Sequence, residues 1–109
     1  MSTDECVFCS IILGQIPVDK VWESGRVLAF HDANPSAESH ILIVPKVHVA
    51  DFQSLDDLAL WDDMRQTAQQ LIEQLNLKNG YKLVLNGGKY QHIAHLHWHL
   101  LGGELKTSQ

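Results

Sequence analysis

The residues of this sequence best suited to chemistry are its histidines. There are seven, and four of them fall between His92 and His99. His95, His97 and His99 alternate with apolar residues in the segment HLHWHLL. Successive side chains on a β-strand point to opposite faces, so a strand over 95–101 would place all three imidazoles on one face. Three imidazoles in a row contribute little to a stable sheet, so the spacing indicates a chemical use.

Two kinds of chemistry suit such a row of imidazoles. A neutral imidazole is a good nucleophile near neutral pH, so one ring could attack a phosphorus atom while its neighbours move protons. Alternatively, histidines two positions apart on a strand could share one ion, which would make a three-histidine metal site. A solvated polar face is the remaining interpretation, and the strict alternation of three histidines disfavours it. The residues alone leave the two chemical interpretations open.

The surrounding sequence predicts an α+β fold that can hold this segment. Residues 6–13 are apolar and end at Gly14, which is typical of a short helix. Residues 55–75 repeat apolar side chains at steps of three and four, which predicts one long helix with Ser54 as its N-cap. Strands are expected over 21–23, 26–31, 40–44, 81–85 and 95–101, the last ending at Gly102-Gly103. Short connections between them favour an antiparallel sheet of about five strands with helices packed against it.

Length and charge limit the class of function. The chain has 109 residues, so we expect a single domain over 1–109. Its net charge of −5 argues against a nucleic-acid partner, which requires a basic surface. No apolar run reaches the roughly 18 residues of a membrane span, so no membrane partner is expected. The first residues lack the basic and apolar regions of a signal peptide, and we therefore predict a cytoplasmic protein.

Four segments resemble the histidine triad (HIT) superfamily. HLHWHLLGG fits its pattern His-φ-His-φ-His-φ-φ, in which φ is an apolar residue. FCSIILGQIP, LAFHDANPSAESHILIVPKVHV and NLKNGYKLVLN resemble its amino-terminal segment, its central strands and the approach to its site. Their order and spacing are similar to those of the Hint branch, the histidine triad nucleotide-binding proteins. The resemblance implies a HIT-like fold, a homodimer, no organic cofactor, and hydrolysis of purine nucleoside 5′-phosphoramidates.

The resemblance also implies a role for each polar residue of the site. His97 would attack the α-phosphorus and form a nucleotidyl-histidine intermediate. His99 would contact the phosphate and help move the proton of the leaving group, while His95 would orient its neighbours. Asn86 would bind the phosphate or the bridging atom. A purine nucleoside monophosphate would further contact Phe8, Phe30, His31, Asp32, Ala33, Gln91 and His92.

Two departures from the Hint pattern leave the leaving group open. Asp32 is not one of these departures, because a carboxylate at this position can accept hydrogen bonds from both ribose hydroxyls. Between Asn86 and His95, however, the chain is about two residues shorter than typical Hint sequences. His92 stands where a serine that can donate to the leaving group is common. His92 either takes over that role or faces solvent.

The two cysteines form a Cys6-x-x-Cys9 pair, which alone is a weak metal signal. Cysteine also packs as a small hydrophobic residue, so a free buried thiol is the plain alternative. Some bacterial HIT proteins and the related galactose-1-phosphate uridylyltransferases have a similar pair, which joins two histidines around a structural zinc. The resemblance therefore implies a zinc ion held by Cys6, Cys9, His48 and His95, a donor set that suits tetrahedral coordination.

The resemblance to the HIT superfamily is compatible with two other functions. The dinucleoside polyphosphate hydrolases of the superfamily have glutamine in place of the third histidine, and His99 disfavours that branch. A purine-nucleotide-binding regulatory module with incidental hydrolysis would use the same pocket, so the sequence does not separate it from the enzyme. For the implied homodimer, we expect the long helix and the strand over 81–85 to form the contact surface.

Overall fold

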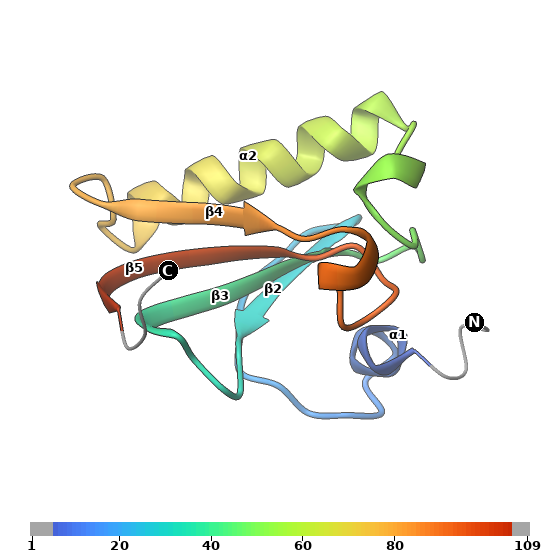
Figure 1. The fold of residues 1–109 in the computed structure, drawn as a ribbon, viewed down its shortest axis with the longest axis horizontal. Helices are drawn as coiled ribbons and strands as arrows, with labels where there is room; N and C mark the ends of the chain where they lie inside the picture. The colour runs from blue at the N-terminus through green and yellow to red at the C-terminus, as the bar shows by residue number, and fades with distance from the viewer. Residues whose placement is uncertain (1–5, 106–109) are drawn as a thin grey trace.

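The computed structural model describes residues 6–105 (Figure 1). Its helices are α1 (Val7–Ile12) and α2 (Leu58–Gln74), with short 3-10 turns η2 (Phe52–Ser54) and η3 (Gly88–Tyr90). Its strands are β1 (Lys20–Glu23), β2 (Val27–His31), β3 (Ala37–Pro45), β4 (Tyr81–Leu85) and β5 (Trp98–Leu105). They form one antiparallel sheet in the order β1-β2-β3-β5-β4, which confirms the predicted α+β class. Within residues 6–105, no helix combines the length and the apolarity needed to cross a membrane.

Both faces of β2 and β3 are buried, which explains their almost unbroken apolar sequence. Alternate residues of these strands belong to two separate cores, as the period of two requires. One core, on the side of α2, contains Val27, Ala29, Ile41 and Ile43. The other core, on the side of α1, contains Leu28, Phe30, Leu42 and Val44. The two helices therefore cover different faces of the sheet (Figure 1).

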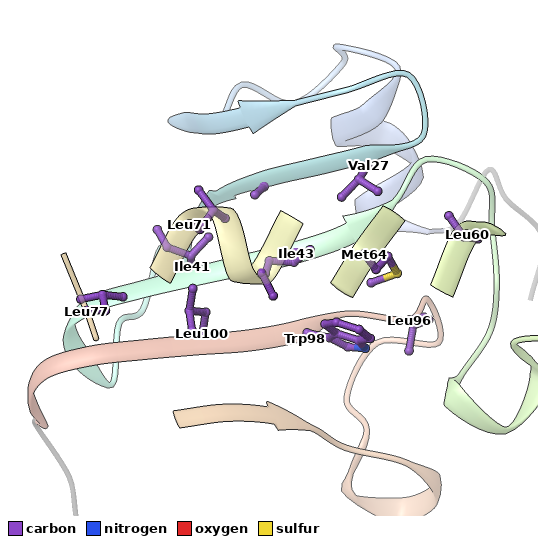
Figure 2. Close-up of a cluster of buried hydrophobic side chains, with 12 residues drawn as sticks. Val27, Ile41, Ile43, Leu60, Met64, Leu71, Leu77, Leu96, Trp98 and Leu100 are labelled. Carbon is purple, nitrogen blue, oxygen red and sulfur yellow. The ribbon is translucent and has the colours of Figure 1, made fainter. Parts of the chain in front are cut away.

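The long helix begins later than the sequence predicts. Its N-cap is Asp57, whose Oδ1 accepts the N–H of Leu60 at 3.1 Å. The expected cap, Ser54, belongs to η2, where its own N–H is bonded to Asp51. Three aspartates and a serine lie within seven residues here, so several caps compete and the tertiary packing decides between them. Figure 2 shows Met64 and Leu71 of α2 packed over the sheet, together with Trp98 and Leu100 of β5.

The strand that follows the histidines also differs from the prediction. It starts at Trp98, not at His95, because its ladder with β3 begins at the pair Trp98–Ile43. It also continues past the two glycines to Leu105. Gly103 has φ +71° beside a register shift between β3 and β5, which is a β-bulge rather than a strand end.

The alternation of the histidine segment is nevertheless confirmed. Leu96, Trp98 and Leu100 all lie in the core shared with α2. The rings of His97 and His99 accordingly lie toward the α1 side, with their centroids 5.1 Å apart. A segment can keep the side-chain alternation of a strand before its backbone enters the ladder, and this one does so from Leu96 onward.

Candidate active site and metal centre

His97 binds its own backbone through one ring nitrogen. Its Nδ1 lies 2.7 Å from the carbonyl oxygen of His95. A carbonyl can only accept, so Nδ1 carries the proton and the lone pair of the neutral ring is on Nε2. Burial lowers the pKa of His97, although the bond to the His95 carbonyl acts in the opposite direction. The neutral form, which is the nucleophilic one, is therefore favoured at neutral pH.

His99 is bonded to a histidine that the sequence analysis did not assign to the site. The Nε2 atom of His40 lies 2.9 Å from Nδ1 of His99 and 3.3 Å from Oδ2 of Asp32. His40 is buried in β3, beside β5 in the sheet. In the sequence, His40 is marked only by its position directly before the apolar run 41–44. Its partner is set by the long-range register that pairs Leu42 with His99.

A cavity of about 660 Å³ lies on this face of the sheet, a volume within the usual range for small-molecule sites. Every residue predicted to contact the nucleotide lines it except Gln91: Phe8, Phe30, His31, Asp32, Ala33, Asn86, His92, His97 and His99. His40 lines it as well. Among its described lining residues none is lysine or arginine, and Asp32 is the only carboxylate. The side-chain donors that this lining offers to an anionic group are therefore imidazole, amide and hydroxyl groups.

The inner wall of the cavity is aromatic. The ring of Phe8 meets that of Phe30 edge to face, with a centroid distance of 5.9 Å. Phe8 also contacts the imidazole of His97 at 5.0 Å. Both phenylalanines are buried, so they belong to the core and to the cavity wall at once. At the rim, Asp32 caps its own loop by accepting the N–H of Asn34 at 2.9 Å.

Two residues of the loop before the triad take different positions. Gln91 donates its side-chain amide to the carbonyls of Ala50 at 2.7 Å and Ile93 at 2.8 Å, so it braces the loop outside the cavity. His92 is exposed and lines the cavity. His92 therefore lies at the rim of the cavity, where its side chain borders the cavity and is also exposed to solvent.

A second cluster, around the first histidine of the triad, contains Cys6, Cys9, His48 and His95. Their ligand atoms all lie within 4.8 Å of one another. His95 Nδ1 is 3.3 Å from the Sγ of Cys6 and 3.5 Å from that of Cys9, and His48 Nδ1 is 3.2 Å from the Sγ of Cys9. Zinc bonds of about 2.3 Å to sulfur and 2.0 Å to nitrogen place tetrahedral ligands roughly 3.5 Å apart. The donor set and its spacing fit zinc.

The outer contacts of this cluster fit a metal as well. His95 donates its Nε2 hydrogen to the carbonyl of Pro45 at 2.9 Å, which leaves the Nδ1 lone pair facing the thiols, as a metal-bound histidine requires. Burial and the neighbouring Cys6 raise the pKa of Cys9 to about 11, so a thiolate here requires a cation. Because both ring nitrogens of His95 are engaged, this ring does not share an ion with His97 and His99.

The comparisons with known proteins identify the family of this chain. The sequence profile of the HIT domain matches residues 13–105. This chain belongs to the HIT family. The match includes the triad and the segment around Asp32 and His40, and it begins after the two cysteines. The matched range therefore contains most of the cavity lining together with His48 and His95, but not Phe8.

Individual HIT relatives cover nearly all of this chain. An uncharacterised HIT-like protein of Helicobacter pylori is 41% identical over 101 residues, which is 90% of this chain and 96% of the relative. A HIT family hydrolase from Legionella pneumophila superposes with a TM-score of 0.88 at 38% identity, covering 94% of this chain and 96% of its own. A histidine triad nucleotide-binding protein from Candida albicans gives a TM-score of 0.85 at 33% identity, with coverages of 92% and 76%.

Proposed function

We propose that this HIT protein hydrolyses purine nucleoside 5′-phosphoramidates, the reaction of the Hint branch. The observation that carries the proposal is the free Nε2 of His97 in a cavity large enough for a nucleotide. The hydrolase name of the Legionella relative and the nucleotide-binding name of the Candida relative support the same class.

The reaction has two displacement steps at phosphorus. In the first, the Nε2 lone pair of His97 forms a bond to the α-phosphorus while the bond to the leaving amine breaks. The departing nitrogen takes a proton from water, and His99 is proposed to help move that proton by hydrogen bonding to the leaving group. In the second step, water attacks the phosphorus and the bond to His97 breaks. The attacking water loses a proton to the solvent, and the nucleoside monophosphate is released.

The proposed substrate pose follows the polarity of the cavity. The purine would lie against the apolar wall of Phe8 and Phe30, and the ribose hydroxyls would donate to Asp32. Asn86 and the triad would supply donors to the phosphate oxygens, since preorganised donors stabilise charge that develops at phosphorus. His92 and His31 at the rim would contact the part of the substrate nearest to solvent.

The proposed metal is a structural zinc held by Cys6, Cys9, His48 and His95. When bound, such an ion supplies a closed four-ligand crosslink and takes no part in the reaction. It would join the start of α1 to the first histidine of the triad, since Cys6 and Cys9 lie at the start of α1 and a third ligand is His95. A reducing cytoplasm, the proposed location, would keep both thiols available as ligands.

A second copy of this chain is the proposed partner. Tyr81, Leu83 and Leu85 alternate along β4 with exposed fractions of 51%, 44% and 39%. They line an apolar groove of about 270 Å³ together with Trp61 and Ile72 of α2. β4 is one of the two edge strands of the sheet, and an exposed apolar edge strand favours association with another chain. A symmetric dimer would cover this groove in both copies.

The test is a substrate panel of nucleoside phosphoramidates and dinucleoside polyphosphates, run on wild type, His97→Ala and His97→Asn. We expect purine phosphoramidates to be the preferred substrates and both variants to lose at least about a thousandfold in turnover. His97→Asn is expected still to bind AMP. Lys89→Ala, on an exposed turn, serves as the matched control. Full activity in a His97 variant would end the proposal, while AMP binding without turnover of any substrate would favour the regulatory module.

A further inference from the structure

The protonation of His40 is decided by a backbone group. The N–H of Ser36 lies 2.9 Å from Nδ1 of His40. A backbone N–H can only donate, so Nδ1 of His40 must be the unprotonated nitrogen. An imidazole has at least one N–H, and in His40 it is therefore on Nε2. His40 is consequently a donor toward the atoms that surround Nε2.

The N–H of His40 in turn determines which ring nitrogen of His99 carries the hydrogen. The Nε2 atom of His40 lies 2.9 Å from Nδ1 of His99, so the hydrogen between them belongs to His40 and Nδ1 of His99 accepts it. In the neutral ring of His99 the remaining hydrogen must then be on Nε2. We propose that His40 is a positioning residue that fixes His99 as the tautomer protonated on Nε2, so that His99 meets the ligand as a hydrogen-bond donor.

This tautomer matters because of what the cavity does not contain. Its described lining residues include no lysine or arginine to hold a phosphate. With Nε2 unprotonated, His99 would direct a lone pair at an anionic ligand and repel it. With Nε2 protonated, it offers an N–H to a phosphate oxygen or to the leaving group. The identity of that ligand rests on the proposed function, whereas the tautomer does not.

A metal ion is the alternative use of the same atoms. Asp32, His40 and His99 bring one oxygen and two nitrogens within 4.8 Å of one another. An ion on Nε2 of His40 would, however, need the hydrogen to move to Nδ1, where the Ser36 N–H already donates. The two donors would face each other, so the contact with Ser36 favours the hydrogen-bonded chain over the metal.

Burial of the two rings supports the neutral forms that this chain requires. Burial lowers the pKa of His40, while the Asp32 carboxylate acts in the opposite direction. Burial, followed by the neighbouring His97 and His40, lowers the pKa of His99 to about 4. Neither ring therefore takes a second proton near neutral pH, and the arrangement of donors and acceptors is retained there.

The Asp32 carboxylate gives His40 a second connection. Its Oδ2 lies 3.3 Å from Nε2 of His40, so Asp32 and His99 are both acceptors for a single hydrogen. In the proposed pose Asp32 also accepts the ribose hydroxyls. A ribose in place would satisfy that carboxylate and leave the hydrogen of His40 to His99. His40 thus connects the ribose-binding residue to the triad.

The test uses ligand-free protein labelled with ¹⁵N in its histidines, whose ring shifts distinguish protonated from unprotonated nitrogen. The spectrum of His99→Gln assigns the His99 signals. In wild type we expect Nδ1 of His99 to be unprotonated and Nε2 protonated. Two variants then separate the contacts of His40. His40→Asn places an amide oxygen near the former Nδ1 and keeps the Ser36 contact, but has no atom to reach His99. His40→Gln extends an amide N–H to His99.

We expect His40→Asn to leave His99 as a mixture of tautomers and to lower kcat by about tenfold to a hundredfold, with KM nearly unchanged. His40→Gln should restore most of both. A wild-type His99 protonated on Nδ1, or an unchanged tautomer in His40→Asn, would overturn the proposal, and the wild-type spectrum decides even if a variant fails to fold. Binding of added Zn²⁺ that shifts the His40 and His99 signals together would favour the metal instead. A protein with the expected tautomer but no phosphoramidate turnover would refute the proposed function alone.

Discussion

The ring of Phe8 lies 5.0 Å from the imidazole of His97, and Phe8 stands between the two cysteines of the metal cluster. The short helix α1 and its N-cap Cys6 therefore supply the wall beside the proposed nucleophile and two of the four proposed zinc ligands. α1 has only six residues, and an isolated helix of that length is not stable in water. Its position must depend on packing and on whatever crosslinks it to the sheet.

The first prediction follows from that dependence and concerns zinc. We expect one zinc per chain in purified protein, measured by elemental analysis, and much less in Cys9→Ser. Removing the ion should lower the free energy of unfolding by about 4 kcal/mol if free zinc is near 1,000 times its dissociation constant. AMP should also bind more weakly to the metal-free protein. Ser10→Ala, beside Cys9, is the matched control. Protein without stoichiometric zinc, with both thiols freely alkylated, would refute the metal site.

The second prediction concerns which nitrogen of His97 becomes modified. Its Nδ1 is bonded to the His95 carbonyl at 2.7 Å, so the nucleotidyl group should be on Nε2. Protein with ¹⁵N-labelled histidine, quenched during turnover, should show phosphorus coupled to Nε2 of this residue in NMR spectra. A phosphorus atom attached to Nδ1, or to another histidine, would mean that the backbone contact does not direct the reaction.

The third prediction concerns the edge strand. Leu83→Glu places a charge in the centre of the apolar groove, where the dimer contact is proposed, and should shift the sedimentation coefficient to that of a monomer. Lys82→Glu changes the charge of the preceding residue, whose side chain alternates to the other face of β4, and should leave the dimer intact. A wild-type protein that sediments as a 12.3 kDa species would contradict the dimer directly.

The fourth prediction concerns stability in acid. The pKa of His99 is about 4 in the folded protein, against about 6.5 in an unfolded chain. Between these values the unfolded chain binds a proton that the folded protein excludes, so stability rises with pH across that window and levels off above it. The groups that face His99 and contribute to its pKa are His97, His40, Asp32 and His92.

The measurement for this prediction is the thermal midpoint at pH 7, 6 and 5 and constant ionic strength. Wild type should lose stability on each step down, and His99→Gln should lose less because one of the excluded protons is gone. The other buried histidines titrate in both proteins, so only the difference between the two slopes reports on His99. Equal slopes would show that His99 takes up its proton without cost to the fold.

The local pattern predicted the strands and the faces of this fold well, because alternation and helical spacing are properties of neighbouring residues. The local pattern was less successful where residues far away in the sequence determine the start of a strand. The alternating segment around His95 does not join the ladder, since Pro45 has no N–H and gives its carbonyl to the ring of His95. The resemblance, and not the local pattern, assigned Gln91 to the nucleotide, and in the structure its side-chain amide donates to the carbonyls of Ala50 and Ile93.

The candidate site shows the same division between local and long-range information. The triad and the residues around Asp32 are contiguous motifs, and a resemblance to known sequences identifies them. His40 is different, because its role depends on a bond from Ser36 in the preceding loop and on β5, which is far away in the sequence. Nothing in the run that follows His40 distinguishes it from an ordinary buried strand residue.

The position of β5 in the sheet affects how the chain folds during its synthesis. β5 lies between β3 and β4, yet it is made after both of them. During vectorial synthesis this interior strand is therefore the last of the five to leave the ribosome, and His99 reaches His40 only once β5 pairs with β3. A product that stops short of β5 would leave β3 and β4 with open edges, which are targets for aggregation and degradation. The proposed active site therefore requires the last of the five described strands to be in place.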